Sequence, residues 1–403
     1  MIGIGASNNP QSDEAGREAA QMANNMLSPK DSPGWGLAFC GGRHNPQSLF
    51  QSMRACLGGV EIVGGAAAGT ITHYGIGYSG CECDVALFPA SMPKPAVVAA
   101  SGLEKGEWKA GRELGAQIGE IANEGDTIFL FYDSLQSSPP PVLNVGSRLL
   151  DGIYAELPDK SLTLAGAGMI GDIHLSGSFV FDGRQSAKGE AVAMVLPSVL
   201  KSRIGIMHGC LPLSSFLEIT KIDGATLYEF NGRPALDVIQ DMFGHQRLDV
   251  NSLPLFLTLG EKHGDPYADY DESSYVNRLI LSADPQDGSL TLFEADFHKG
   301  ARVQIMTRDN QTMLESVQKR SRELIASLDG KNPVLAFYID CAGRTRAFSG
   351  ADKEEAKILQ ETLGPEIPLL GFYSGVEIAP LLGRSRPLDW TGVLTLLTLE
   401  ETL

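Results

Sequence analysis

LAFCGGR at residues 37–43 and LAFYIDCAGR at residues 335–344 are the two stretches from which the fold of this 403-residue chain is best predicted. Each begins with an apolar run of strand length and ends in a Gly-Arg pair. After the first, a helix is predicted from Asn45, an N-cap residue followed by proline. After the second, a helix is predicted whose apolar face carries Ala356, Leu359 and Leu363. Both stretches therefore predict a buried strand that leads into a helix.

A second pair of matching stretches follows in the same order: EIVGGAAAGTI at residues 61–71 and PLLGFYSGVEI at residues 368–378. Two matches at similar spacing predict an internal duplication. A fainter echo lies between them, with a strand at 127–132, a helix at 142–154 and a strand at 162–164 that enters Ala165-Gly166-Ala167-Gly168. We expect a mixed α/β (α+β) fold of two related halves, residues 1–205 and 206–403, with mixed sheets covered by helices.

Composition and charge exclude several classes of protein. A hydrophobic fraction of 43% and a charged fraction of 20% are typical of a globular chain. The net charge of −17 would repel phosphate backbones and anionic membrane surfaces, so we expect neither nucleic acid nor membrane as a partner. There is no apolar stretch of about 20 residues, no signal-peptide pattern at the start and no regular spacing of the six cysteines. We expect a cytoplasmic protein with reduced thiols.

The order of the motifs resembles the FIST domains, with an N-terminal and a C-terminal pattern. The N-terminal pattern resembles AGREAA at 15–20, the apolar strand before Cys40, IVGGAAAG at 62–69, HLSG at 174–177 and DG at 182–183. The C-terminal pattern resembles FNGRPALD at 230–237, CAGR at 341–344 and GFYSGVEI at 371–378. The family usually has Gly-Gly-Glu-Ile where this chain has Gly375-Val376-Glu377-Ile378. A β-branched valine does not easily adopt a positive φ, so this turn is expected to differ.

The resemblance implies a sensory input module of intracellular signal transduction that is thought to bind small ligands. Some members of the family are reported to bind haem. The chain leaves no room for a kinase, a cyclase or an F-box beyond the two halves, so the output would run through a separate signalling partner.

Four residues near the second strand end are candidates for a ligand site: Asp340, Cys341, Arg344 and Glu377. Loops converge where strands end, an arginine can clamp a carboxylate, and an acid can hold an amine. The structural alternative is an ion pair between Arg344 and Glu377. In the first half the counterparts are Cys40 and Arg43. If the halves are related, the two sets would face a shared cleft.

Other functional readings have weaker signals. Cys341 would be a nucleophile only with a base, and no histidine lies within its motif, so a cysteine-dependent enzyme is an alternative without a convincing catalytic motif. Cys81, Cys83 and His73 have spacing that is too short for a usual metal site. The Gly64–Gly69 string misses the phosphate-binding patterns. A ligand-free protein-interaction scaffold is a further alternative. No Cys-x-x-Cys-His motif singles out a haem ligand among His44, His73, His174, His208, His245, His263 and His298.

Overall fold

The computed structural model describes residues 2–139, 141–157, 162–244 and 249–400, which form three six-stranded sheets, a seven-stranded sheet and a short ribbon. The first sheet has the order β1 (Gly3–Ser7), β6 (Cys83–Pro89), β2 (Pro33–Gly41), β3 (Glu61–Ala67), β12 (Val180–Gly183), β13 (Ser186–Ala187). The second has the order β7 (Ala96–Ser101), β14 (Glu190–Val195), β8 (Thr127–Asp133), β11 (Thr163–Met169), β25 (Val376–Leu381), β26 (Arg384–Leu388). The third has the order β15 (Leu200–Met207), β27 (Gly392–Leu399), β23 (Leu335–Cys341), β24 (Leu369–Ser374), β4 (Gly69–Thr72), β5 (Gly75–Gly77).

These three sheets share one strand plan. In each, a parallel pair lies at the centre: β2 with β3, β8 with β11, and β23 with β24. Antiparallel strands flank the pair on both sides. The mixed α/β class with mixed sheets is confirmed. The stretch at 127–168, which resembles the two matching stretches only weakly in sequence, therefore contains the central strands of a third sheet with the same plan. The sequence predicted two copies.

The outermost hairpins are exchanged between the sheets in a cycle. The hairpin β4–β5 follows β3 of the first sheet along the chain but pairs with β24 of the third. Likewise β12–β13 follows β11 of the second sheet and pairs with β3 of the first. The hairpin β25–β26 follows β24 of the third sheet and pairs with β11 of the second. Each sheet is thus completed by another sheet's chain segment, and a domain division at 205/206, which falls inside β15, stays a prediction.

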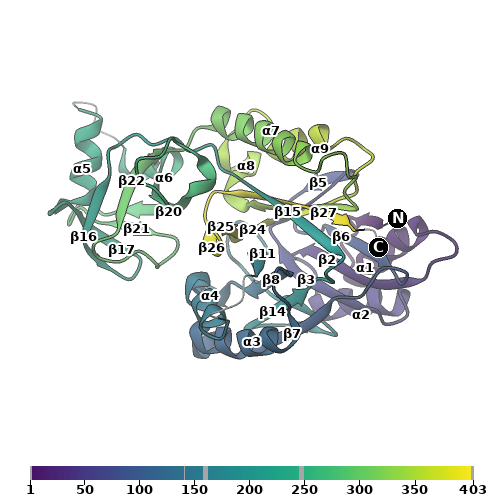
Figure 1. The fold of residues 1–403 in the computed structure, drawn as a ribbon. Helices are drawn as coiled ribbons and strands as arrows, with labels where there is room; N and C mark the ends of the chain where they lie inside the picture. Colours follow the sequence, from purple (N-terminus) through teal and green to yellow (C-terminus); the bar gives the residue numbers. More distant parts are fainter. Residues whose placement is uncertain (1, 140, 158–161, 245–248, 401–403) are drawn as a thin grey trace.

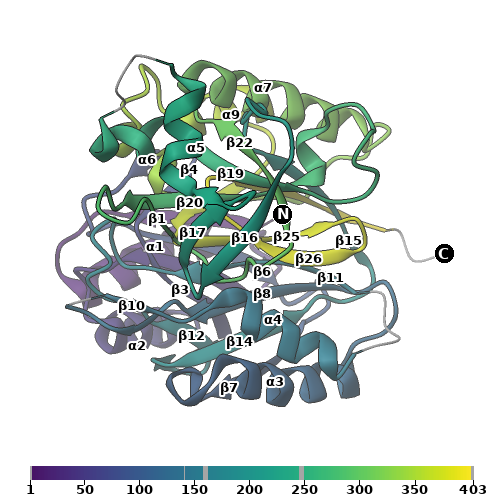
Figure 2. The ribbon, with the colours of Figure 1, turned by 90° about the vertical axis from the view of Figure 1, so that its left-hand side faces the viewer.

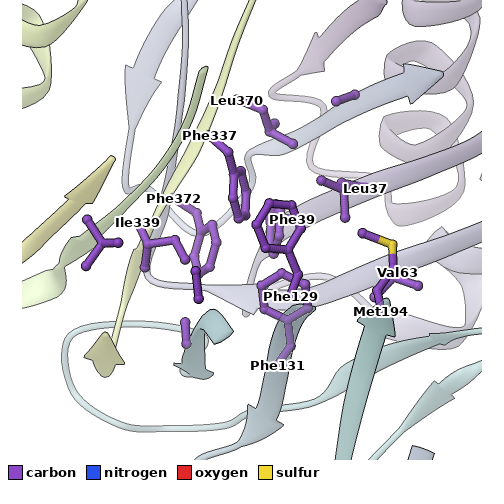
Figure 3. Close-up of a cluster of buried hydrophobic side chains, with 14 of the residues drawn as sticks. Leu37, Phe39, Val63, Phe129, Phe131, Met194, Phe337, Ile339, Leu370 and Phe372 are labelled. Carbon is purple, nitrogen blue, oxygen red and sulfur yellow. The ribbon is translucent and has the colours of Figure 1, made fainter. Parts of the chain in front are cut away.

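The inner faces of the three sheets meet in one aromatic core (Figure 3). Phe39 comes from the first sheet, Phe131 from the second, and Phe337 and Phe372 from the third. The ring centroids of Phe39 and Phe372 are 4.0 Å apart, and those of Phe39 and Phe131 are 5.4 Å apart. All four side chains are fully buried. Aromatic contacts across all three sheets hold the centre of the molecule together.

Pairs of helices cover the outer faces of the sheets (Figures 1 and 2). They are α1 (Ser12–Met26) with α2 (Pro46–Cys56), α3 (Glu107–Ile121) with α4 (Gly146–Ala155), and α7 (Asn310–Ala326) with α9 (Glu355–Leu363). The pair α3 and α4 crosses where two glycines meet. A Cβ at Gly111 would lie 2.2 Å from the carbonyl oxygen of Leu149, so no larger residue fits there without displacing a backbone.

The fourth sheet is inserted between β15 and β23 and lies to one side of the other three (Figure 1). Its order is β16 (Leu217–Asp223), β22 (Arg302–Thr307), β19 (Leu257–Lys262), β20 (Tyr275–Ala283), β21 (Leu290–Leu292), β17 (Thr226–Phe230), β18 (Arg233–Pro234). The remaining elements are α5 (Ala235–Met242), α6 (Leu253–Phe256), α8 (Arg346–Ser349), the ribbon β9 (Leu135–Ser137) with β10 (Val142–Leu143), and single 3₁₀ turns at Leu103–Lys105, Val250–Ser252, Glu272–Ser274 and Ala342–Arg344. A buried carboxylate, Glu294, accepts hydrogen bonds from the backbone and hydroxyl of Ser147 and so joins this part to α4.

Candidate functional site

Just after β23, Arg344 is fully buried and its guanidinium is bound by protein acceptors. Its Nε and Nη2 donate to the carboxylate of Glu355 at 2.8 and 2.6 Å, and Nε lies 3.1 Å from Asp340 Oδ1. Nη1 donates to the carbonyl oxygen of Trp390 at 2.9 Å. A bidentate pair of this kind fixes the 3₁₀ turn Ala342–Arg344 to the start of α9. The ion-pair alternative therefore has Glu355 as its main partner, where the sequence suggested Glu377.

Glu377 and Cys341 lie beside this ion pair and are also buried. Glu377 accepts a hydrogen bond from the Ser374 hydroxyl at 2.8 Å and one from the Thr391 backbone at 3.3 Å. Burial raises the pKa of Glu377 and the pKa of the Cys341 thiol. The neighbouring charge of Glu377 raises the pKa of the thiol further. A nucleophile needs the opposite shift. The geometry gives no support to Cys341 as a catalytic thiolate.

The turn before Glu377 accommodates its valine without strain. Neither Gly375 nor Val376 has a positive φ, and Val376 is the first residue of β25. A Cβ at Gly375 would lie 2.9 Å from Ile170, so glycine is required there by close packing.

The two counterparts in the first half, Cys40 and Arg43, lie in different environments. Cys40 is fully buried on β2, directly across from Cys83 on β6, whereas Arg43 is exposed at the strand end. Where β2 approaches the third sheet, phenyl rings fill the space, with Phe39 stacked on Phe372. Between the bodies of these strands the space is filled by an aromatic core, and Arg43 is exposed while Arg344 is buried. The shared cleft between the two strand ends stays a prediction.

A cavity of about 250 Å³ opens where the first sheet meets the exchanged hairpin β4–β5 of the third sheet. Its polar wall is formed by Ser7, Asn8, Thr70, Thr72, Glu82 and Asp84. Met22, Tyr74 and Ile76 supply apolar contacts. The cavity thus begins directly after the glycine string at 64–69, at Thr70 of β4. We call it the Asp84 cavity.

Asp84 is the second residue of β6 and only 4% exposed. Ala86 and Phe88, two and four residues on, belong to the central core, so the alternation of a strand directs Asp84 to the same inner face. Burial raises the pKa of Asp84 to about 7; a hydrogen bond from Thr70 lowers it in part, and the charge of Glu82 raises it. At neutral pH this carboxyl group is poised between its two protonation states.

Glu82 presents a second carboxylate to the same cavity. Its Oε1 accepts from the Ser79 backbone at 2.6 Å and its Oε2 from the Gly80 backbone at 2.8 Å. Gly77 makes room for it, since a Cβ there would lie 2.7 Å from Oε1. Backbone amides hold the group in place but bring no positive charge.

Some other buried carboxylates have a cationic partner, since Glu355 pairs with Arg344 and Glu272 with Arg320. Others, such as Glu294 and Glu377, are held by hydrogen bonds, as Glu82 is. Within the described residues, no lysine, arginine or histidine forms an ion pair with either Asp84 or Glu82. Two buried acids without a counter-cation therefore line a cavity.

The sequence alone does not single out these two acids. Glu82 lies between Cys81 and Cys83, and Asp84 follows Cys83. The available signal was a carboxylate inside an otherwise apolar strand, CDVALF at 83–88. A buried polar residue is more informative than an exposed one, because it must be satisfied.

The positions of the described histidines and cysteines add no support to the metal and haem interpretations. Among the described residues, no group of three or more histidine, cysteine, aspartate or glutamate side chains is placed to hold a metal ion. The Nε2 atoms of His44, His73 and His208 each lie 2.7–2.9 Å from a backbone carbonyl oxygen. His245 lies outside the described residues.

The comparisons place the chain among known proteins. Residues 34–233 match the model of the FIST N domain and residues 235–380 that of the FIST C domain. An uncharacterised protein of Mycobacterium tuberculosis strain H37Rv is 26% identical over 263 residues, 64% of this chain and 66% of that protein. One of Mycobacterium bovis is 29% identical over 192 residues, 47% and 49% of the two chains. The crystal structure of a cyanuric acid hydrolase from A. caulinodans aligns over 100% of this chain and 99% of its own at 10% identity, with a TM-score of 0.37.

The molecule is a mixed α/β protein of interlocked sheets with an N-terminal and a C-terminal family region. The chain belongs to the FIST family, whose domains are described as sensory domains of signal transduction. None of the helices in the described ranges is both long and apolar enough to cross a bilayer.

Proposed function

We propose that this protein is a cytoplasmic sensory module that binds a small cationic ligand in the Asp84 cavity and acts through a separate signalling partner. The observation that carries the proposal is the pair of buried carboxylates, Asp84 and Glu82, that line a cavity and lack an ion pair in the described structure. The family assignment supports the sensory role but names no ligand.

The charge of the cavity defines the ligand class. A buried carboxylate without a counter-charge is costly, and it either takes up a proton or acquires a cation. The pKa of about 7 for Asp84 is the protonated alternative. An ammonium group would replace the proton and restore a buried ion pair. The hydroxyls of Thr70 and Thr72 would then hold a neighbouring hydroxyl of the ligand, so a small amino alcohol fits the wall best.

The size of the cavity limits the ligand. Its volume of about 250 Å³ lies just below the range of about 300–1,000 Å³ that is typical of small-molecule sites. A peptide or a dinucleotide is too large. Met22 and Ile76 would contact a short aliphatic segment.

The position of the cavity supports a sensory role. A ligand there would touch β6 and β1 of the first sheet together with the hairpin β4–β5, which belongs to the third sheet. The hairpin is connected to the N-terminal region and paired with the C-terminal one. Binding would therefore favour one relative placement of the two regions, which a partner would read.

The experiment is a thermal-shift and calorimetric titration with ethanolamine, using ethylene glycol as the uncharged probe of similar shape. We expect a rise in melting temperature with ethanolamine only, and its loss in Asp84→Asn. Asp269→Asn, a change of the same kind at an exposed site, is the control and should respond like the parent protein. No response to ethanolamine, or an equal response in Asp84→Asn, would overturn the proposal.

A further inference from the structure

We propose a second ligand site, for a small neutral polyol, in a cavity of about 310 Å³ at the carboxyl end of β8 in the second sheet. Asp133 and Asn144 form its buried wall, and Lys188 and Glu104 lie at its rim. The site is separate from the Asp84 cavity and shares no lining residue with it.

Asn144 supplies an unused acceptor. The residue is 2% exposed, its backbone N–H donates to the carbonyl of Ser134 at 2.8 Å, and its Nδ2 donates to the carbonyl of Asp133 at 2.7 Å. The first bond fixes the backbone of Asn144 and the second fixes the orientation of its side-chain amide. Its Oδ1 is buried and has no hydrogen-bond partner within the described part of the chain. A buried acceptor in this state is costly, and a donor from a ligand in the cavity would satisfy it.

Asp133 is held just as firmly. Its Oδ1 accepts from the Leu135 backbone at 3.1 Å, and its Oδ2 accepts from the Gly189 backbone at 2.8 Å. Each carboxylate oxygen can accept a further hydrogen bond. Together with Asn144, Asp133 gives the cavity a rigid wall of acceptors.

The rest of the lining selects a hydroxyl-rich ligand. Hydroxyl groups come from Ser137, Ser138, Ser176 and Ser178. Of the side chains that line the cavity, only that of Leu135 is apolar, and none is aromatic. A flat aromatic ligand would find no aromatic side chain to stack on here. A polyol both donates and accepts at every hydroxyl, which matches a wall of acceptors and serines, and the opposite charges at the rim favour a neutral molecule.

The site also has a reason for its place in the fold. Asp133 on β8, Cys341 on β23 and Gly41 on β2 occupy the same place in the three sheets, because each belongs to the last residue pair of its central parallel strands. At the end of β23 the Arg344 ion pair fills the space, and at the end of β2 the backbone of Gly80 lies against Gly41. The equivalent position in the second sheet is open. In the second sheet, the carboxyl end of the central strand β8 is therefore available to a ligand, as the sequence predicts for such strand ends.

The test is ligand-observed saturation-transfer NMR and calorimetry with myo-inositol and D-glucose as probes. We expect millimolar or tighter binding of at least one probe, weakened about tenfold in Asn144→Leu, which removes the free acceptor. Gly177→Leu should abolish binding by filling the cavity, because a Cβ at Gly177 meets no atom within 4 Å and the change need not disturb the fold. Asn251→Leu, at an exposed position away from the cavity, is the control.

Two results would overturn this proposal. One is that neither probe binds the parent protein at millimolar concentration. The other is that binding survives Gly177→Leu in a variant with the parent's melting temperature. The response to ethanolamine should persist in Gly177→Leu, so a failure at either site is distinguishable from a failure at the other.

Discussion

Asp84 on β6 of the first sheet accepts a hydrogen bond from Thr70 on β4, a strand of the third sheet, across the junction of the two sheets. The hairpin β4–β5 is an exchanged segment, in which Thr70 pairs with Phe372, more than 300 residues further along the chain. The hydrogen bond between Thr70 and Asp84 therefore connects the first sheet to the third. The protonation state of Asp84 is thus coupled to the contact between two sheets.

The affinity for an amine should depend on pH around the pKa of Asp84. An ammonium group pairs with the ionised carboxylate, whose pKa is about 7, so binding should strengthen as pH rises from 6 to 8. Calorimetry with ethanolamine at several pH values measures this. Binding should release up to one proton near neutral pH, which buffers of different ionisation enthalpy reveal. A pH-independent affinity would contradict the assignment of Asp84 as the cation partner.

Folding stability should also depend on the protonation of Asp84, but it should decrease as pH rises, whereas the affinity for an amine should increase. The pKa of Asp84 is about 7 in the folded protein and about 3.9 when unfolded, so the native state binds more protons between these values. The free energy of unfolding should therefore fall as pH rises through this window, by at most about 4 kcal/mol from this group. In Asp84→Asn that contribution is absent. Urea unfolding at pH 5 and pH 8 should show a smaller difference in the variant than in the parent.

Removing one ring from the central core should be costly. Phe39 contacts Phe131, Phe337 and Phe372, which come from both other sheets. Phe39→Ala should lower the free energy of unfolding by about 3–5 kcal/mol through lost burial and the cavity left behind. Phe348→Ala, at a side chain that is 47% exposed, should change it by about 0.5 kcal/mol or less. Equal effects of the two changes would show that the sheets do not depend on a common core.

The Cys341 thiol should be slow to react. Burial raises its pKa and only 3% of the residue is exposed, whereas Cys56 and Cys81 are partly exposed. Iodoacetamide followed by peptide mass spectrometry should label Cys56 and Cys81 first and Cys341 only on unfolding. Rapid, selective labelling of Cys341 in the native protein would restore the cysteine-dependent enzyme as an alternative.

The local parts of the fold could be predicted from the sequence, because they depend on neighbouring residues. The strand before Arg344 and the helix that begins after Asn45 follow from apolar runs and from an N-cap, and both are present. The strand that was expected at 127–132 is β8 at 127–133. In these cases the hydrophobic pattern and the turn residues agree with the tertiary structure.

Contacts between distant segments could not be predicted in the same way. The structural alternative to a ligand site paired Arg344 with Glu377, but Glu355 in the first turn of α9 forms the bidentate pair. Nothing in a single sequence ranks two acids that lie on different elements, here α9 and β25. The Asp84 cavity depends on a hairpin that leaves its own sheet, and the free Oδ1 of Asn144 depends on two backbone bonds. Strand order across sheets, which the sequence does not encode locally, decides both sites.

The cyclic exchange of hairpins should make the two regions of the chain depend on each other for folding. A break between Pro197 and Ser198, in the turn between β14 and β15, would leave residues 1–197 with β4–β5 unpaired and with the second sheet lacking β25–β26. Unpaired edges and an exposed aromatic core favour association over a cooperative fold. We expect the 1–197 fragment alone to lack a cooperative thermal transition, and both fragments expressed together to co-purify with a transition near that of the intact chain. Circular dichroism and size-exclusion chromatography measure these outcomes. A sharp, independent transition of the 1–197 fragment would show that the first two sheets fold without the third, and that the exchanged hairpins add little to stability.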